Sequence, residues 1–336
     1  MRIIARALPL LVLAPLACVA ANAQAPAAAQ AMEVVRLDPA LDAVIAPGTT
    51  IERVATGFGF VEGPMWRDGR LWFSDLMDDK LLAVSPDGTV ETLIEHAGGY
   101  LNPPPGTTLG PNAMVPDKDG TVLLVRQGGR TIVRVDSALR FHPFLSDYQG
   151  KKLNSPNDLV FAPDGALWFT DPPFGLLGMD DDPAKELPFN AVFRYADGKL
   201  TPVITDLNLP NGIGFSPDGK TLYVSNYGPD MFVRAYDVGA GGTLSNPRML
   251  IAYPHPQGAG GPDGLKVDRA GNIWTTGPGG IRIVTPAGKV LGQIRLPEVA
   301  ANLAFADDGH TVYITATHSV YRFRTKVAGE RPLYYR

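Results

Sequence analysis

The sequence has almost no cysteine, which restricts how the chain can be stabilised. Its single cysteine, Cys18, lies in an apolar run near the N-terminus, so the rest of the chain has no thiols for disulfides. The five histidines show no metal-ligand spacing, which argues against a zinc site built from histidine and cysteine. No Gly-x-Ser-x-Gly pattern is present either, which argues against a serine hydrolase with a nucleophile elbow. We therefore expect stability to come from core packing.

Strong charge of either sign is also missing. The formal net charge is −4 and becomes −6 without Arg2 and Arg6, and no basic run or patch is visible. Nucleic acids and anionic membranes are therefore not expected partners, because both are bound through clustered Lys and Arg. A small molecule is the expected partner, and the sequence does not indicate the oligomeric state.

Long apolar runs are absent except near the N-terminus. Arg2 and Arg6, the apolar run Ala7 to Ala21 and the small residues up to Ala23 are typical of a secretory signal peptide. The run is too short for a membrane anchor. We predict cleavage after Ala23, export to the periplasm and no membrane association afterwards, with lipid attachment at Cys18 as the alternative. Residues 24–48 are predicted to be a partly disordered leader.

Helical periodicity is missing beyond the leader, and one hairpin pattern takes its place. A polar residue, an apolar strand, a turn containing Asp and Gly and a second apolar strand recur six times. The turn glycines are Gly69, Gly120, Gly165, Gly219, Gly271 and Gly309. Their spacing is near the roughly 40 to 50 residues that one propeller blade requires. A second hairpin follows in most copies, so residues 49–336 are predicted to form one all-β domain, a six-bladed propeller of four-stranded antiparallel blades.

The last copy has too few residues after Arg324 for a clear fourth strand. An unassigned strand, Thr50 to Ala55, precedes the first copy. We predict that this N-terminal strand completes the last blade and closes the ring, because closure removes an exposed sheet edge.

The residue at the start of the first strand carries a side-chain oxygen in every copy. In a propeller these strands line the central channel, so equivalent residues form a ring around one end of it. The six residues are Glu62, Asn112, Asn157, Asn211, Asp263 and Asn302. A ring of oxygen donors is suited to a hard cation such as Ca²⁺, which takes about 6 to 8 oxygen ligands. Two carboxylates among them match the charge of a divalent ion.

Each of these residues also has an ordinary structural interpretation, since Asn and Asp beside Pro or Gly are common turn residues. Hairpin geometry does not require a side-chain oxygen at the start of the first strand in all six copies. This regularity favours a ring of oxygen ligands over the structural interpretation. For Asp75, Asp158 and Asp171 the structural interpretation is preferred. The tryptophans in the repeated strands are expected to pack between blades; they are Trp66, Trp72, Trp168 and Trp274.

Four short motifs resemble those of the regucalcin, gluconolactonase and luciferin-regenerating-enzyme family of six-bladed propellers. In order they are Glu62-Gly63-Pro64, Pro156-Asn157-Asp158, Pro210-Asn211-Gly212 and Pro262-Asp263-Gly264, and the resemblance covers residues 49 to 325. It implies one catalytic divalent metal held by Glu62, Asn157, Asn211 and Asp263, with Asp263 also acting as acid and base. Calcium is the expected ion, with zinc, manganese and magnesium as alternatives.

The segment Asp171 to Leu176, followed by Lys185 to Pro188, is similar to the bacterial gluconolactonase branch. Regucalcin members carry a substrate-binding Arg where this chain has Ser155. The further candidates for channel-ring or substrate contacts are Asn112, Asn302, Ser155 and Glu186. The predicted function is an exported, metal-dependent lactone hydrolase. The alternatives are a non-catalytic binding propeller with a structural calcium and a phosphotriester hydrolase.

Overall fold

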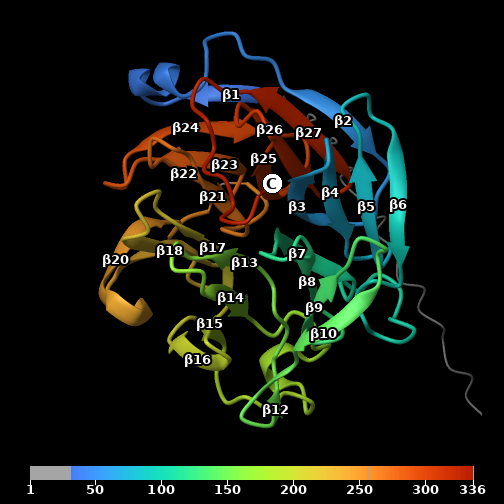
Figure 1. Cartoon of the computed structure of the whole chain (residues 1–336). Helices are drawn as coiled ribbons and strands as arrows, with labels where there is room; N and C mark the ends of the chain where they lie inside the picture. The colour runs from blue at the N-terminus through green and yellow to red at the C-terminus, as the bar shows by residue number, and fades with distance from the viewer. Residues whose placement is uncertain (1–31, 257, 336) are drawn as a thin grey trace, which may run out of the picture.

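Six antiparallel sheets surround a central channel in the computed structural model (Figure 1). The structure describes residues 32–256 and 258–335, so the predicted signal peptide lies outside the described residues. The predicted all-β, six-bladed propeller is confirmed. In every blade the innermost strand lines the channel and the next two strands follow outward in chain order.

The first three blades each contain four consecutive strands. Blade 1 contains β3 (Val61–Arg67), β4 (Arg70–Asp75), β5 (Lys80–Val84) and β6 (Val90–Glu95). Blade 2 contains β7 (Pro111–Pro116), β8 (Val122–Arg126), β9 (Thr131–Val135) and β10 (Phe141–Leu145). Blade 3 contains β13 (Leu159–Phe161), β14 (Leu167–Asp171), β15 (Ala191–Ala196) and β16 (Lys199–Ile204). The small hairpin between blades 2 and 3 is formed by β11 (Asp147–Tyr148) and β12 (Lys151–Lys152).

The last two blades each recruit a strand from the N-terminal part of the chain. Blade 4 contains β17 (Pro210–Phe215), β18 (Thr221–Asn226), β19 (Phe232–Val238) and β20 (Leu244–Ala252). Blade 5 contains β21 (Leu265–Val267), β22 (Ile273–Gly277), β23 (Gly280–Val284), β24 (Val290–Arg295) and β1 (Glu33–Arg36). Blade 6 contains β25 (Ala300–Phe305), β26 (Thr311–Ala316), β27 (Ser319–Arg324) and β2 (Glu52–Thr56).

The ring is closed by β2, as predicted from the short last repeat. It pairs antiparallel with β27, placing Glu52 opposite Arg322. The Arg322 guanidinium also contacts the Glu52 carboxylate at 2.8 Å. The outer edge of blade 6 is therefore covered by backbone hydrogen bonds from a segment more than two hundred residues away in sequence.

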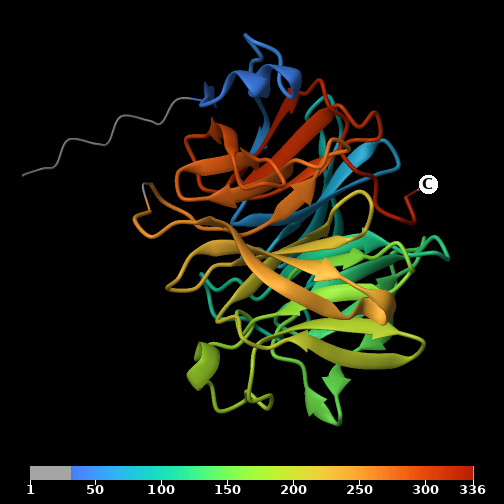
Figure 2. The same cartoon turned by 90° about the vertical axis from the view of Figure 1, so that its left-hand side faces the viewer.

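The segment before β2 packs on the propeller beside blade 5 (Figures 1 and 2). β1 pairs with β24, and the short 3-10 helix η1 (Pro39–Ala43) follows it. Leu41 and Ile45 are fully buried in the core shared by blades 5 and 6. This docking was not predicted from the sequence, because three apolar residues among alanines and prolines have no strand or helix periodicity.

The tryptophans pack between blades, as predicted. Trp66 of blade 1 stacks on Tyr313 of blade 6, with ring centroids 5.3 Å apart. Edge-to-face contacts join Trp168 to Phe215 of the next blade and Trp274 to Phe305, at 5.5 and 5.7 Å. Large rings are suited to these positions because the wedge-shaped gap between twisted blades requires bulky apolar side chains.

Helical structure is confined to short 3-10 turns in the described residues. Besides η1 they are η2 (Met179–Asp181) and η3 (Ala240–Gly242). Within residues 32–256 and 258–335, no helix is long and apolar enough to cross a membrane.

Candidate functional site

The six predicted ring residues all lie at the start of an innermost strand, or just before it. Glu62, Asn112, Asn157, Asn211 and Asn302 are at most 6% exposed, and Asp263 is intermediate in exposure. The side chains of five blades are therefore largely withdrawn from bulk water at this end of the channel. Such burial makes any charge here dependent on a compensating partner.

Hydroxyl groups on the second strands fix the backbone of the ring. Each hydroxyl donates to the backbone carbonyl of the ring residue in the next blade. The pairs are Ser74 with Asn112 at 2.6 Å, Thr170 with Asn211 at 2.7 Å and Ser225 with Asp263 at 2.7 Å. Sequence analysis missed these residues, although aligning the second strands places Ser or Thr at equivalent positions. The bonds link neighbouring blades at the level of the ring.

Buried carboxylates hold the loops that lead into the ring. Asp171 accepts from the backbone N–H groups of Asn154 and Ser155, both at 2.8 Å. Asp75 accepts in the same way from Gly59 and Phe60. Burial raises the pKa of Asp171 to about 7. The structural interpretation of Asp75 and Asp171 is confirmed, since both carboxylates act on backbone.

Glu62 and Asp263 are the two carboxylates of the ring, and the charge of Glu62 acts on Asp263. Burial raises the pKa of Glu62 to about 7, although Gly63 and Asn302 donate hydrogen bonds to its carboxylate. Burial, followed by the charges of Glu62 and Asp158, raises the pKa of Asp263 well above its usual range. Two adjacent carboxylates favour sharing a proton unless a cation lies between them. This pair is therefore suited to bind either a proton or a metal ion.

Asn157 and Asn211 are the two neutral residues among the four predicted metal ligands, and each can supply an amide oxygen. The Asn211 Oδ1 atom is buried and has no hydrogen-bond donor among the described residues. An orphaned buried acceptor is costly, and a cation would satisfy it. Within residues 32–256 and 258–335, no three His, Cys, Asp or Glu side chains are grouped to hold a metal. A cation at the ring would thus need amide oxygens, and the set Glu62, Asn157, Asn211 and Asp263 supplies oxygen donors only, which suits a hard ion.

The remaining ring residues, Asn302 and Asn112, have their side chains engaged by other protein groups. The Asn302 Nδ2 atom donates to Glu62 at 2.9 Å, and its Oδ1 accepts from Lys266 Nζ at 3.2 Å. Asn112 Nδ2 donates to Gln127 Oε1 at 2.8 Å. Asn302 therefore orients one of the ring carboxylates, whereas Asn112 is tied to its own blade.

Ser155 and Glu186, the other two candidates, occupy different environments. Ser155 is fully buried, and its Oγ accepts from the Gly175 backbone N–H at 2.8 Å. It thereby anchors the loop after β14 beside the ring. Glu186 is exposed, and its carboxylate accepts from the Lys152 backbone N–H at 2.8 Å. That contact ties Glu186 to the β11–β12 hairpin, and its role as a substrate contact stays a prediction.

One ion pair beside the ring was not predicted. Lys266 Nζ lies 3.5 Å from Asp158 Oδ2, joining blades 5 and 3 across the channel. Sequence analysis treated Asp158 as structural and did not single out Lys266. The two residues are more than one hundred positions apart, so only the closed ring brings them together.

Two aromatic rings flank the Asp263 side of the site. Phe174 and Tyr227 are half-buried and meet edge to face, with centroids 6.4 Å apart. Burial and the nearby Asp263 charge raise the pKa of the Tyr227 phenol. Tyr227 thus stays protonated near neutral pH and offers an apolar face with a hydroxyl at its edge. Neither residue was predicted as a site residue from the sequence, because both lie in loops outside the repeat.

Comparison with known proteins agrees with this architecture. A gluconolactonase from Zymomonas mobilis is 36% identical, covering 95% of this chain and 96% of that protein. The pentonolactonase XacC of Haloferax volcanii is 28% identical, covering 79% and 84%. A solved gluconolactonase structure from Xanthomonas campestris superposes with a TM-score of 0.76 at 31% identity, covering 89% of this chain and 98% of that one.

The family profile described as the SMP-30/Gluconolactonase/LRE-like region matches residues 60–318. The match includes all six ring residues and excludes the N-terminal strands β1 and β2. The chain therefore belongs to the SMP-30/gluconolactonase/LRE-like family.

Proposed function

We propose that the protein hydrolyses sugar-acid lactones with the help of one divalent cation at the ring. Lactone hydrolysis follows from the family and from its gluconolactonase and pentonolactonase relatives. The observation that supports metal dependence is the buried Asn211 Oδ1 atom without a hydrogen-bond donor, in a ring that also contains the Glu62 and Asp263 carboxylates. Glu62, Asn157, Asn211 and Asp263 would hold the ion, with calcium as the preferred candidate on the chemistry of an oxygen-only donor set.

A divalent cation bound there would polarise the lactone carbonyl and favour the developing oxyanion. The protein groups have separate tasks. The Asp263 carboxylate would accept a proton from the water molecule as that water adds to the lactone carbonyl carbon. That proton is then available to the ring oxygen when the ester C–O bond breaks, giving the open hydroxy acid. Glu62 stays in place because Asn302 and the Gly63 backbone donate to it.

A pH-stat measurement over a lactone panel tests this proposal. Aldonolactones of five and six carbons should release acid, activity should fall to background after EDTA, and added Ca²⁺ should restore it. Asp263→Asn should lose turnover while it keeps the wild-type fold. Activity that survives complete chelation would contradict metal dependence. No turnover of any lactone by the metal-loaded protein would favour a non-catalytic propeller, and turnover of organophosphates alone would favour phosphotriester hydrolysis.

Export is a second part of the proposal and rests on the sequence alone. Arg2, Arg6 and the apolar run to Ala21 have the order of charge, apolar core and small residues that a signal peptide requires. N-terminal sequencing of protein recovered from the periplasmic fraction should begin at Gln24. Recovery of the uncleaved chain from the cytoplasm would contradict it.

A further inference from the structure

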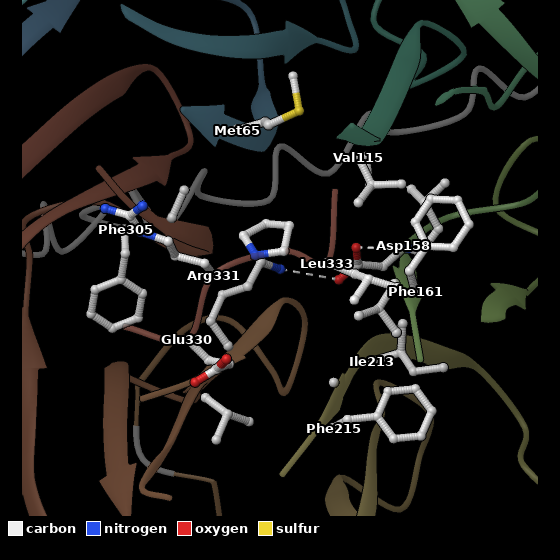
Figure 3. Close-up of a pocket in the computed structure, with 18 of the residues that line it drawn as sticks. Met65, Val115, Asp158, Phe161, Ile213, Phe215, Phe305, Glu330, Arg331 and Leu333 are labelled. Atoms are coloured by element: carbon white, nitrogen blue, oxygen red, sulfur yellow. Dashed lines mark hydrogen bonds and ion pairs between the residues drawn. The ribbon is translucent and has the colours of Figure 1, made fainter. Parts of the chain in front are cut away.

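A cavity of about 340 Å³ lies in the channel next to the ring (Figure 3). Its walls come from the innermost strands of all six blades, on the side of the ring that faces the Asp-Gly turns. Figure 3 shows apolar side chains around this space. Those that line it include Met65, Val115, Phe161, Ile213, Phe215 and Phe305. Cavities of this size and lining are typical of small-molecule sites.

The C-terminal segment 330–335 covers the outer end of this cavity. Figure 1 shows the end of the chain over the middle of the ring, and Figure 2 shows it at one face of the propeller. The Glu330 N–H donates to the Val267 carbonyl of blade 5 at 3.0 Å. Across the channel the Tyr334 ring meets Phe161 of blade 3 edge to face, at 4.8 Å. The C-terminal segment thus covers part of the cavity on the face opposite the ring.

The inner end of the cavity carries one ion pair. Lys266 Nζ donates to the Leu265 carbonyl at 3.0 Å and to Asn302 Oδ1 at 3.2 Å, and it forms an ion pair with Asp158, 3.5 Å from Oδ2. The ammonium group therefore balances the charge of Asp158, while its two hydrogen bonds go to other protein oxygens. Asp158 is 3% exposed, and its Oδ1 accepts from the Leu159 N–H at 2.8 Å. Its Oδ2 has no hydrogen-bond donor among the described residues.

These features define the chemistry of a ligand. The apolar walls favour an apolar body, because burial of that body and of the walls is favourable. The charged groups of the lining balance, with Asp158 and Glu330 against Lys266 and Arg331, so the cavity favours a neutral molecule. Among the described residues that line the cavity, Asp158 Oδ2 is the one buried acceptor without a hydrogen-bond donor, since its contact with Lys266 is an ion pair only. The ligand should therefore carry one hydroxyl that donates to this oxygen.

We propose that this cavity is a binding site for a neutral apolar alcohol or phenol, separate from the lactone site on the other side of the ring. The hydroxyl donates to Asp158 Oδ2, and the apolar body lies between Met65, Val115 and Ile213. Lys266 keeps its two hydrogen bonds and its ion pair with Asp158. The C-terminal segment covers the bound molecule from the turn side.

Isothermal titration calorimetry with 2-naphthol tests the site on the full-length protein. The wild type should bind 2-naphthol with a stoichiometry of about one. The methyl ether of 2-naphthol, which cannot donate, should bind about tenfold or more weakly, as should the 2-naphthoate anion. Equal affinity for the ether would overturn the assignment of the hydroxyl. No saturable binding up to millimolar concentration would overturn the site.

Two variants with different physical effects locate the binding. Asp158→Asn should weaken 2-naphthol binding by about tenfold or more, because an amide replaces the acceptor. Val115→Phe should abolish binding by filling the cavity. The matched control Asp119→Asn changes an exposed turn carboxylate and should bind like the wild type. Thermal melts identify any variant that does not fold. Wild-type affinity in a folded Val115→Phe protein would overturn the proposal, as would equal weakening by Asp119→Asn.

Discussion

The Asn302 side chain of blade 6 donates to the Glu62 carboxylate of blade 1, with Nδ2 2.9 Å from Oε2. These residues are 240 positions apart and meet at the seam where the propeller closes. Asn302 is held in turn by Lys266 of blade 5. The orientation of a predicted metal ligand therefore depends on closure of the ring, so that fold and site are coupled through one amide.

Replacing Asn302 should weaken metal binding without unfolding the protein. Asn302→Ala removes the donor that orients Glu62, and the loss of such supporting contacts typically lowers metal affinity about 10- to 100-fold. Calcium titration calorimetry on chelator-treated protein measures the effect. The exposed Asn208→Ala serves as the matched control and should bind like the wild type. Unchanged calcium affinity in Asn302→Ala would contradict the positioning role.

Metal binding should strengthen as the pH rises through about 7. The pKa of Glu62 is raised by burial to about 7, above its usual 4.5. The metal-free fold therefore binds a proton at Glu62 more tightly than the unfolded chain does. The contribution of this proton to stability is fully present below about pH 4.5 and is lost as the pH rises through about 7. Because a cation must displace that proton, the increase in Tm on adding calcium should be larger at pH 8 than at pH 5.

The variant Glu62→Gln provides the comparison for that experiment. Without the titrating carboxylate, the metal-free Tm should depend less on pH between 5 and 8. The increase in Tm on adding calcium should also be small at every pH. A wild-type calcium effect that is independent of pH would contradict the assignment of Glu62 as a ligand that is protonated in the metal-free protein.

Leu41 should contribute to stability although it precedes the propeller repeats. The side chain is fully buried against blades 5 and 6, so Leu41→Ala should lower the free energy of unfolding by about 2 to 5 kcal/mol. Leu37, four residues earlier, is 59% exposed. The substitution Leu37→Ala should therefore change the free energy of unfolding by less than about 0.5 kcal/mol. Chemical denaturation measures both. Equal effects would contradict the docking of η1.

Ser155 should influence substrate binding rather than metal binding. Its Oγ anchors the Gly175 backbone beside the ring, so Ser155→Ala should loosen the loop that carries Phe174. We expect KM for the lactone to rise several-fold while calcium affinity is unchanged. Steady-state kinetics and calorimetry separate the two effects, with the exposed Ser146→Ala as control. A loss of calcium affinity equal to the rise in KM would contradict this role.

The repeat made much of the fold predictable. Each Asp-Gly turn has a local signature, and six copies in a row allow the strands, the blades and the closing strand near Thr50 to be placed. The same alignment identified Glu62, Asn211 and Asp263, because residues at equivalent strand starts must face one channel. Local pattern and symmetry were sufficient for these features.

Other parts of the site depend on contacts that no local pattern encodes. The ion pair of Lys266 with Asp158 and the bond from Asn302 to Glu62 join different blades. The docking of Leu41 depends on an apolar surface that only the assembled blades 5 and 6 provide. In each case the partner residue is selected by the closed ring, so the sequence offers a candidate side chain without its partner.

The most direct test of the central claim is anomalous diffraction from crystals of the protein soaked in Mn²⁺ after chelation. Manganese accepts the same oxygen ligands as calcium and scatters anomalously. We predict one peak per chain at the ring, within bonding distance of oxygens from Glu62, Asn157, Asn211 and Asp263. A fully soaked crystal with no peak at the ring, or with a peak bound by other residues, would contradict the account.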